Sequence, residues 1–222
     1  GPLPSELFDL SSTLKALYMN GNFFSGSISP AVGGLTSLTD FYAHDNDFSG
    51  TIPSEVGLLT SLENMVLSEN LIWGSIPSHF SSLDALQVLS VYRRTKPGLR
   101  LSGPLPAFDY VPNLIELYLD GNDLTGAIPA SFLNASAKPE IQVFLAHNQL
   151  SGVVPAGIND LPGLNIHLEG NKITGFPSVF CNQTNWMNGQ IASAGCDAFL
   201  CPVGKANVIG RANQSLACSA CV

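Results

Sequence analysis

Asn46–Pro53 reads NDFSGTIP, and the same pattern returns as NLIWGSIP at Asn70–Pro77 and as NDLTGAIP at Asn122–Pro129. An apolar ladder such as Leu38-x-x-Phe41-x-Ala43 comes before these tails. Altered copies of the tail stand at Asn22–Ile28 (NFFSGSI), Leu101–Pro106 (LSGPLP) and Asn148–Pro155 (NQLSGVVP). A unit of about 24 residues cannot bury its apolar face alone, so neighbouring units must stack around one continuous core. The chain is therefore predicted to be a solenoid, an architecture that favours a binding surface over a catalytic pocket.

The units keep a common register along the chain. They begin at Leu14, Leu38, Leu62, Leu86, Leu114, Ile141 and Leu164. Alternation along a short strand turns two apolar side chains of each unit inward, as at Leu17 and Met19. The Asn after each strand can satisfy backbone groups that no sheet reaches. These residues are predicted to stack as a ladder: Asn22, Asn46, Asn70, Asn122, Asn148 and Asn171. In the fourth unit Arg94 replaces the Asn and five extra residues precede Leu101, so we expect an interrupted ladder and a loop there.

The pattern resembles the plant-type leucine-rich repeat, LxxLxLxxNxLxGxIPxxLxxL, over residues 1–177. That form occurs in the ectodomains of plant receptor-like kinases and in polygalacturonase-inhibiting proteins. The resemblance implies an α/β solenoid: a right-handed superhelix with a parallel β-sheet on its concave face and short strands or 3-10 turns on its convex side. It also implies extracellular recognition, but this family hosts many ligands, so the fold selects none of them.

The composition excludes some classes of partner. The 222 residues are 45% hydrophobic and 12% charged, with a net charge of −8. A nucleic-acid-binding protein normally presents a basic face, so we expect no nucleic-acid partner. No run of 18 apolar residues occurs, so a membrane would be reached only through segments outside this chain. Gly1 opens inside a repeat tail, which suggests the mature or trimmed portion of a longer protein.

Cysteines and sequons gather toward the C-terminus. The five cysteines are Cys181, Cys196, Cys201, Cys218 and Cys221, and the candidate glycosylation sites are Asn134, Asn182 and Asn213. Residues 178–222 are predicted to form a disulfide-bearing cap on the solenoid of residues 1–177, because an uncapped last unit would expose its core. Spacing does not fix connectivity. Short loops favour Cys181–Cys196 and Cys201–Cys218, with Cys201–Cys221 as the alternative. These features predict a secreted glycoprotein or a cell-surface ectodomain.

Aromatic side chains line the predicted concave face. Its central column is Tyr18, Tyr42, Val66, Ser90, Tyr118, Phe144 and His167. The next column is Asn20, His44, Ser68, Tyr92, Asp120, Ala146 and Glu169. Outward aromatic residues are enriched at recognition sites, although they are also good cross-strand neighbours in any sheet. We expect the aromatic rings and the histidines of these columns to contribute to a ligand surface.

The segment Arg93–Arg100 (RRTKPGLR) holds four of the nine basic residues. Arg93, Arg94 and Arg100 are candidates to bind an acidic partner such as a uronate polysaccharide, a sulfated glycan or a peptide carboxylate. The alternative is a solvated loop whose charge maintains solubility. If the loop overhangs the concave face, an acidic ligand would contact the tyrosines and these arginines together.

No group of residues in the sequence indicates catalysis. It lacks a glycine-rich phosphate loop, cysteine pairs at zinc spacing and a Gly-x-Ser-x-Gly motif, so we predict no enzyme, no cofactor and no metal. The sequence favours an extracellular recognition module that binds a peptide, protein or glycan on its concave face. Two alternatives are an inhibitor of a secreted polysaccharide hydrolase and a structural protein of a cell wall or adhesive matrix.

Overall fold

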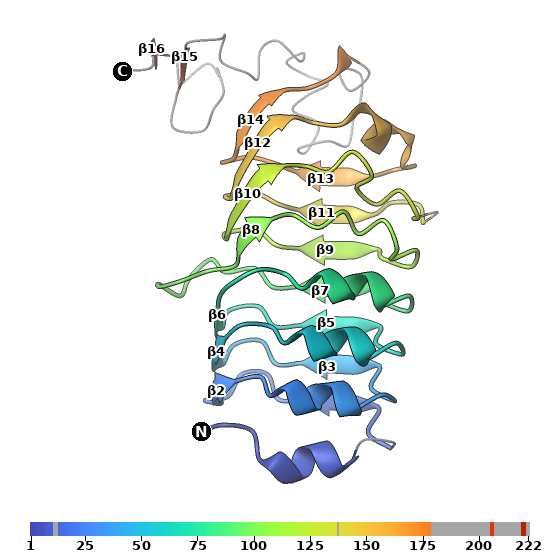
Figure 1. The fold of residues 1–222 in the computed structure, drawn as a ribbon. Coiled ribbons are helices and arrows are strands. Elements are labelled where there is room, and N and C mark those ends of the chain that lie inside the picture. The colour runs from blue at the N-terminus through green and yellow to red at the C-terminus, as the bar shows by residue number, and fades with distance from the viewer. Residues whose placement is uncertain (11–12, 137, 179–204, 207–218, 221–222) are drawn as a thin grey trace.

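The computed structural model describes residues 1–10, 13–136, 138–178, 205–206 and 219–220. Among these residues the repeat units stack into a solenoid, and one short strand from each unit joins a seven-stranded parallel sheet (Figure 1). The strands are β1 Ala16–Tyr18, β3 Asp40–Tyr42, β5 Asn64–Val66, β7 Val88–Ser90, β9 Glu116–Tyr118, β11 Gln142–Phe144 and β13 Asn165–His167. Their order in the sheet is their order in the chain, because each unit stacks on the one before it.

The strand register confirms the predicted inward and outward columns. Phe41 pairs with Met65, and both side chains are fully buried in the core. Tyr18 pairs with Tyr42 at one end of the sheet, and Phe144 pairs with His167 at the other. One outward column therefore runs across all seven strands.

A second layer of parallel strands follows the turn after the concave sheet, and it is split in two. One sheet contains β2 Ser25–Ser27, β4 Asp47–Gly50 and β6 Leu71–Ile72. The other contains β8 Ser102–Pro104, β10 Asp123–Ala127, β12 Gln149–Val153 and β14 Lys172–Gly175. A single bridge between Gly74 and Leu101 links the two. The split lies at the fourth unit, where Arg94 interrupts the repeat and a loop projects from the stack (Figure 1).

Short 3-10 helices form the convex side of several units: η1 Ser5–Leu10, η2 Pro30–Gly34, η3 Ser54–Leu58, η4 Ser78–Ser82 and η5 Ala156–Asp160. The proline of the repeat tail precedes η3 and η4 as their N-cap, with φ of −69° at Pro53 and −61° at Pro77, the range in which the proline ring fixes this angle. Close stacking requires small residues here. A Cβ on Gly57 would lie 2.6 Å from the carbonyl oxygen of His79 in the next unit.

The predicted asparagine ladder is present. Asn46, Asn70, Asn122, Asn148 and Asn171 are at most 7% exposed. Each Nδ2 donates to a carbonyl of the preceding unit; that of Asn122 lies 2.8 Å from Val91 O. Each Oδ1 accepts a backbone N–H of the same preceding unit, from a residue further along that unit. For example, Oδ1 of Asn122 accepts from Leu101 N at 3.2 Å. Asn22 belongs to the first unit and is exposed, because no complete unit precedes it.

The predicted cap and disulfides fall on Cys181, Cys196, Cys201, Cys218 and Cys221, which lie outside the described residues. The same holds for the sequons at Asn182 and Asn213, so the boundary at residue 177 stays a prediction. In this region β15 Lys205–Ala206 and β16 Ser219–Ala220 pair antiparallel. Asn134 lies on an exposed turn, and its glycosylation stays a prediction. Within the described ranges, no helix has the length and apolar character needed to cross a membrane.

Candidate ligand-binding site on the concave face

The aromatic column forms two separate clusters. The rings of Tyr18 and Tyr42 lie 5.1 Å apart between centroids, and the Tyr42 ring lies 6.2 Å from that of His44. At the other end, Tyr118, Phe144 and His167 form a row across β9, β11 and β13. Their ring centroids are 4.8 and 4.5 Å apart, and the planes are within 11° of parallel. Val66 and Ser90 separate the clusters, so the face has two aromatic patches.

Arg93 holds the inserted loop together from the inside. Its side chain is buried, with 3% of the residue exposed. The guanidinium donates to three carbonyl oxygens of the loop, those of Lys96, Pro97 and Leu99. Burial, and next the charge of Arg100, lower the pKa of Arg93, but an arginine remains a cation in a protein. Because its donors are directed at the backbone, Arg93 has little capacity left for a ligand.

Two more cations of the insertion also bond within the protein. Lys96 Nζ lies 2.7 Å from the carboxylate of Asp47, two units away, and also donates to Asn46 O. Arg100 donates through NH1 to the carbonyl oxygens of Arg93 and Gly121. These contacts attach the loop to the units on both sides of it.

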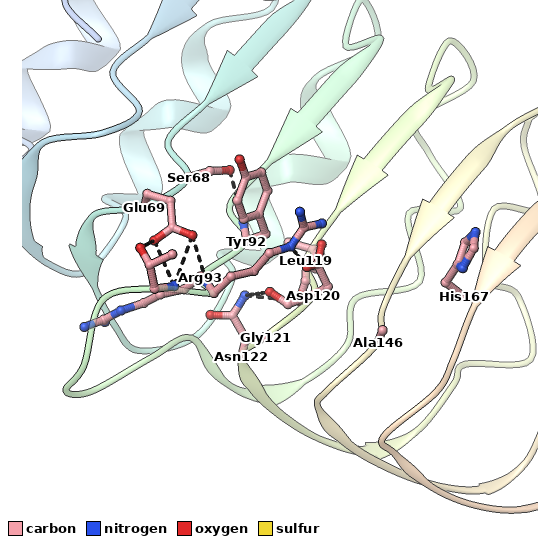
Figure 2. Close-up of polar contacts among 12 residues, drawn as sticks. Ser68, Glu69, Tyr92, Arg93, Leu119, Asp120, Gly121, Asn122, Ala146 and His167 are labelled. Atoms are coloured by element: carbon pink, nitrogen blue, oxygen red, sulfur yellow. Dashed lines mark hydrogen bonds and ion pairs between the residues drawn. The ribbon is translucent and has the colours of Figure 1, made fainter. Parts of the chain in front are cut away.

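Glu69 supplies the acceptor that fixes the start of this loop. Its carboxylate accepts from Arg94 N at 2.9 Å and from Thr95 Oγ1 at 2.6 Å, and also from Thr95 N (Figure 2). Burial acts to raise the pKa of Glu69, but the hydrogen bonds from Thr95 and from the backbone amides of Arg94, Thr95 and Lys96 lower it on balance. Glu69 is 7% exposed, so it is a structural carboxylate. Sequence reasoning missed it because its partners are 25 and 26 residues away.

Arg94 is the insertion's cation that faces the concave surface. Its side chain is 56% exposed, and its guanidinium carbon lies 4.4 Å from the ring centroid of Tyr92. Nε donates to Asp120 Oδ2 at 2.5 Å, and this hydrogen bond is the main reason that the pKa of Arg94 is raised. Arg94 therefore joins the loop to the end of β9.

A depression of about 620 Å³ opens beside this ion pair. It is lined by residues of the insertion, by the ends of β9, β11 and β13, and by the turns that follow them: Arg93, Arg94, Arg100, Asp120, Gly121, Asn122, Asp123, Phe144, Ala146, His147, His167 and Glu169. Ala146 stands between Asp120 on one side and His167 on the other (Figure 2). The methyl group of Ala146 leaves space where the neighbouring units present long side chains.

Two acceptor atoms near this space lack a hydrogen-bond partner. They are Oδ1 of Asp120 and Oε2 of Glu169, and both atoms are buried. The side chain of Asp120 is 6% exposed. Glu169 Oε1 lies 3.5 Å from Nδ1 of His167, whose ring closes the aromatic row. Both atoms are hydrogen-bond acceptors, so what this region lacks is a hydrogen-bond donor.

The structure thus sorts the residues proposed from the sequence. It brings Arg93, Arg94, Arg100, Phe144 and His167 to one depression, with Tyr92 and Tyr118 beside it. Tyr18, Tyr42 and His44 form a separate patch at the N-terminal end of the sheet. Sequence reasoning assigned no role to Asp120, Ala146 and Glu169, although their place in the column beside the aromatic row was a usable signal.

The groups around the depression are of few chemical kinds. Burial, and next the carboxylate of Glu116, raise the pKa of Tyr118, which keeps its phenol neutral. Within the described ranges, no group of three or more His, Cys, Asp or Glu side chains is placed to hold a metal ion. The site presents aromatic rings, one exposed guanidinium and two buried carboxylate oxygens.

Comparisons with known proteins agree with this architecture. The family model for the Leucine Rich Repeat matches residues 13–35 and 113–135. No curated protein matches the chain. Among solved structures, the ectodomain of the Arabidopsis thaliana receptor kinase GASSHO1/SCHENGEN3, in complex with CASPARIAN STRIP INTEGRITY FACTOR 2, is 29% identical with a TM-score of 0.75, over 83% of this chain and 22% of that one.

Two further receptors are similar to the same extent. The plant peptide hormone receptor RGFR1, in complex with RGF2, is 28% identical with a TM-score of 0.75, over 83% of this chain and 29% of its own. A TDR receptor is 32% identical with a TM-score of 0.74, over 83% of this chain and 31% of its own. The chain therefore spans between 22% and 31% of the length of these receptors. With its repeated sequence pattern, its stacked parallel strands and these matches, the chain has the leucine-rich-repeat fold, and its solenoid is similar to the ectodomains of plant receptor kinases.

Proposed function

We propose that the chain is an extracellular recognition module that binds a peptide on its concave face, over strands β9, β11 and β13. The observation that carries this proposal is the depression beside the row of Tyr118, Phe144 and His167. Aromatic and arginine side chains are those that most often dominate the energy of an interface. Here they converge on one concave surface, with Arg94 held at its rim by Asp120.

The comparisons support the class of ligand. The solenoid is similar to GASSHO1/SCHENGEN3, solved in complex with CASPARIAN STRIP INTEGRITY FACTOR 2, and to the plant peptide hormone receptor RGFR1, solved in complex with RGF2. A peptide lying across parallel strands would contact successive aromatic rings, whose spacing of 4.5 to 4.8 Å follows that of the strands. An extracellular setting is supported by the five cysteines and three sequons, and by similarity to receptor ectodomains.

The structure changes how the basic insertion enters this proposal. Arg93, Lys96 and Arg100 direct donors at backbone carbonyls or at Asp47, which supports a structural role for most of the charge. Arg94 remains available at the rim because more than half of its side chain is exposed. Binding of a highly acidic glycan would need several unpaired cationic side chains close together, so we favour a peptide over an acidic glycan.

The experiment that tests the proposal is a selection of random peptides displayed against the purified chain, with the affinity of enriched peptides measured by calorimetry. Phe144→Ala removes the central ring of the row and should lower affinity about tenfold or more, as loss of a central aromatic anchor does. His79→Ala on the exposed convex side is the matched control and should leave affinity unchanged. Thermal unfolding of both variants checks that they are folded. Peptides that bind Phe144→Ala as tightly as the original chain would contradict the proposed surface.

A further inference from the structure

The space above Ala146 has a specific shape. Asp120, Ala146 and Glu169 follow β9, β11 and β13 by two residues each, so they occupy one outward column. Asp120 and Glu169 are two strands apart, and their backbones are therefore separated by roughly 9–10 Å. Ala146 between them contributes a single methyl group. The part of the depression above Ala146 is a gap lined by Asp120, Ala146 and Glu169, beside Phe144 and His167 of the ring row.

Several of the donors around this gap already have partners. The charged groups that line the depression are Arg93, Arg94, Arg100, Asp120, Asp123 and Glu169, and their formal charges cancel. The guanidinium of Arg93 and NH1 of Arg100 donate to backbone carbonyls, and Nε of Arg94 donates to Asp120 Oδ2. Asp123 Oδ1 accepts from Gln149 Nε2 at 3.2 Å. The local net charge is therefore zero and does not select the ligand. The selection comes from the hydrogen bonds that the ligand can form with the atoms of the gap.

Two buried acceptors remain unpaired in this balance, Asp120 Oδ1 and Glu169 Oε2. Leaving a carboxylate oxygen buried without a donor is unfavourable, and a carboxylate can accept from more than one donor at once. Asp120 can thus keep its bond to Arg94 while accepting from a ligand. The chain's net charge of −8 adds a long-range attraction for cations.

We propose that the gap above Ala146 takes the cationic group of a basic side chain of the bound peptide, which donates to Asp120 Oδ1 and Glu169 Oε2. This proposal rests on the peptide-binding function proposed above and names the chemistry of one subsite. A guanidinium presents donors at both ends of a planar fork, which suits carboxylates on opposite sides of a gap. An ammonium group offers the same charge from a single point.

The probe that tests the subsite is N-acetyl-arginine amide, a cation without a carboxylate, titrated into the ¹⁵N-labelled chain. At the affinity per atom typical of larger ligands, its dissociation constant should be on the order of 1 mM. Amide shifts should concentrate at Gly121, Ala146 and Gly170, around the depression. N-acetyl-lysine amide tests whether an ammonium group is accepted, and binding of either cation supports the proposal. N-acetyl-citrulline amide, which has nearly the same shape and no charge, should bind at least about tenfold more weakly.

Variants locate the effect. Ala146→Leu fills the gap and should abolish the shifts, and Asp120→Asn and Glu169→Gln should each weaken binding about tenfold, because each removes one charged acceptor at constant size. Asp45→Asn is the matched control. It removes one carboxylate three residues after β3, in the turn of the second unit, where φ is 55°, a conformation that Asn tolerates, and it should bind like the original chain.

The outcomes separate this proposal from the peptide-binding function. Binding of the citrulline analogue as tightly as the arginine analogue, unchanged binding to Ala146→Leu, or no shifts well above the expected dissociation constant would each overturn the cation subsite. Selected peptides that need Phe144 but show no preference for a basic residue would also overturn it and leave the proposed function standing. Localised arginine amide binding with no selectable peptide would support the subsite and count against the proposed function.

Discussion

Replacing Asn122 by alanine tests the internal support of the solenoid most sharply. Nδ2 of Asn122 donates to Val91 O at 2.8 Å and to Leu119 O at 3.1 Å, and Oδ1 accepts from Leu101 N at 3.2 Å. Leu119 O keeps a second donor, Nδ2 of Asn148 at 2.9 Å. The loss therefore falls on the carbonyl of Val91 and the amide of Leu101, two residues that are at most 5% exposed.

Each of the two buried groups left without a partner costs about 1–3 kcal/mol, so Asn122→Ala should lower the free energy of unfolding by roughly 2–6 kcal/mol. Equilibrium urea unfolding measures this loss as a shift of the midpoint at constant slope. Asn22→Ala is the matched control. Asn22 is exposed and its amide bonds only to Met19 O and Asn20 O in its own turn, so water can replace it at a cost below about 1 kcal/mol. A loss for Asn122→Ala no larger than that for Asn22→Ala would refute the reasoning.

Three further changes test other parts of the structure. Arg93→Met removes three donors from the carbonyls of the inserted loop and should destabilise the chain by about 2–4 kcal/mol, with faster hydrogen exchange across the loop. Unchanged exchange there would show that the loop keeps its conformation without Arg93. Glu69 has a lowered pKa, so the stability that it contributes is complete above its ordinary value of 4.5 and is lost as the pH falls below that value. Urea unfolding between neutral and acid pH should therefore show a smaller acid loss in Glu69→Gln than in the original chain, and equal losses would contradict the assigned shift. Gly57→Ala places a Cβ 2.6 Å from His79 O and should cost about 1–3 kcal/mol in thermal or urea unfolding, whereas no loss would mean that the convex units can separate freely.

Much of the fold could be predicted because the same pattern of apolar residues and Asn recurs in nearly every unit. The apolar ladder and the Asn of each tail predict a strand, an inward pair and a buried amide, and Phe41, Met65 and Asn70 occupy these places. Arg94 at the ladder position predicts an interruption, and the second layer of strands divides there.

The roles of the arginines could not be predicted, because they depend on contacts between units. Adjacent in sequence, Arg93 and Arg94 have opposite environments: one is buried among loop carbonyls, and the other is exposed over Tyr92. Spacing does not reveal which of the two turns inward. The partner that fixes their backbone, Glu69, lies in the preceding unit and gives no local signal.

The candidate site was predicted in part. The aromatic columns located the concave face, and Phe144 and His167 lie in the depression. Ala146 has no polar or ionisable side-chain group, so the sequence offered no reason to assign it a role, although its small side chain shapes the gap. The open acceptors of Asp120 and Glu169 depend on which donors surround them, and those donors come from an insertion whose path the repeat pattern does not specify.

The most direct test of the account is the structure of the chain bound to a peptide obtained by selection. We predict that the peptide lies across β9, β11 and β13, against Tyr118 and Phe144, with a basic side chain above Ala146 and its donors within hydrogen-bonding distance of Asp120 Oδ1. A peptide bound on the convex side along the 3-10 helices, or on the concave face with the gap above Ala146 empty, would contradict it.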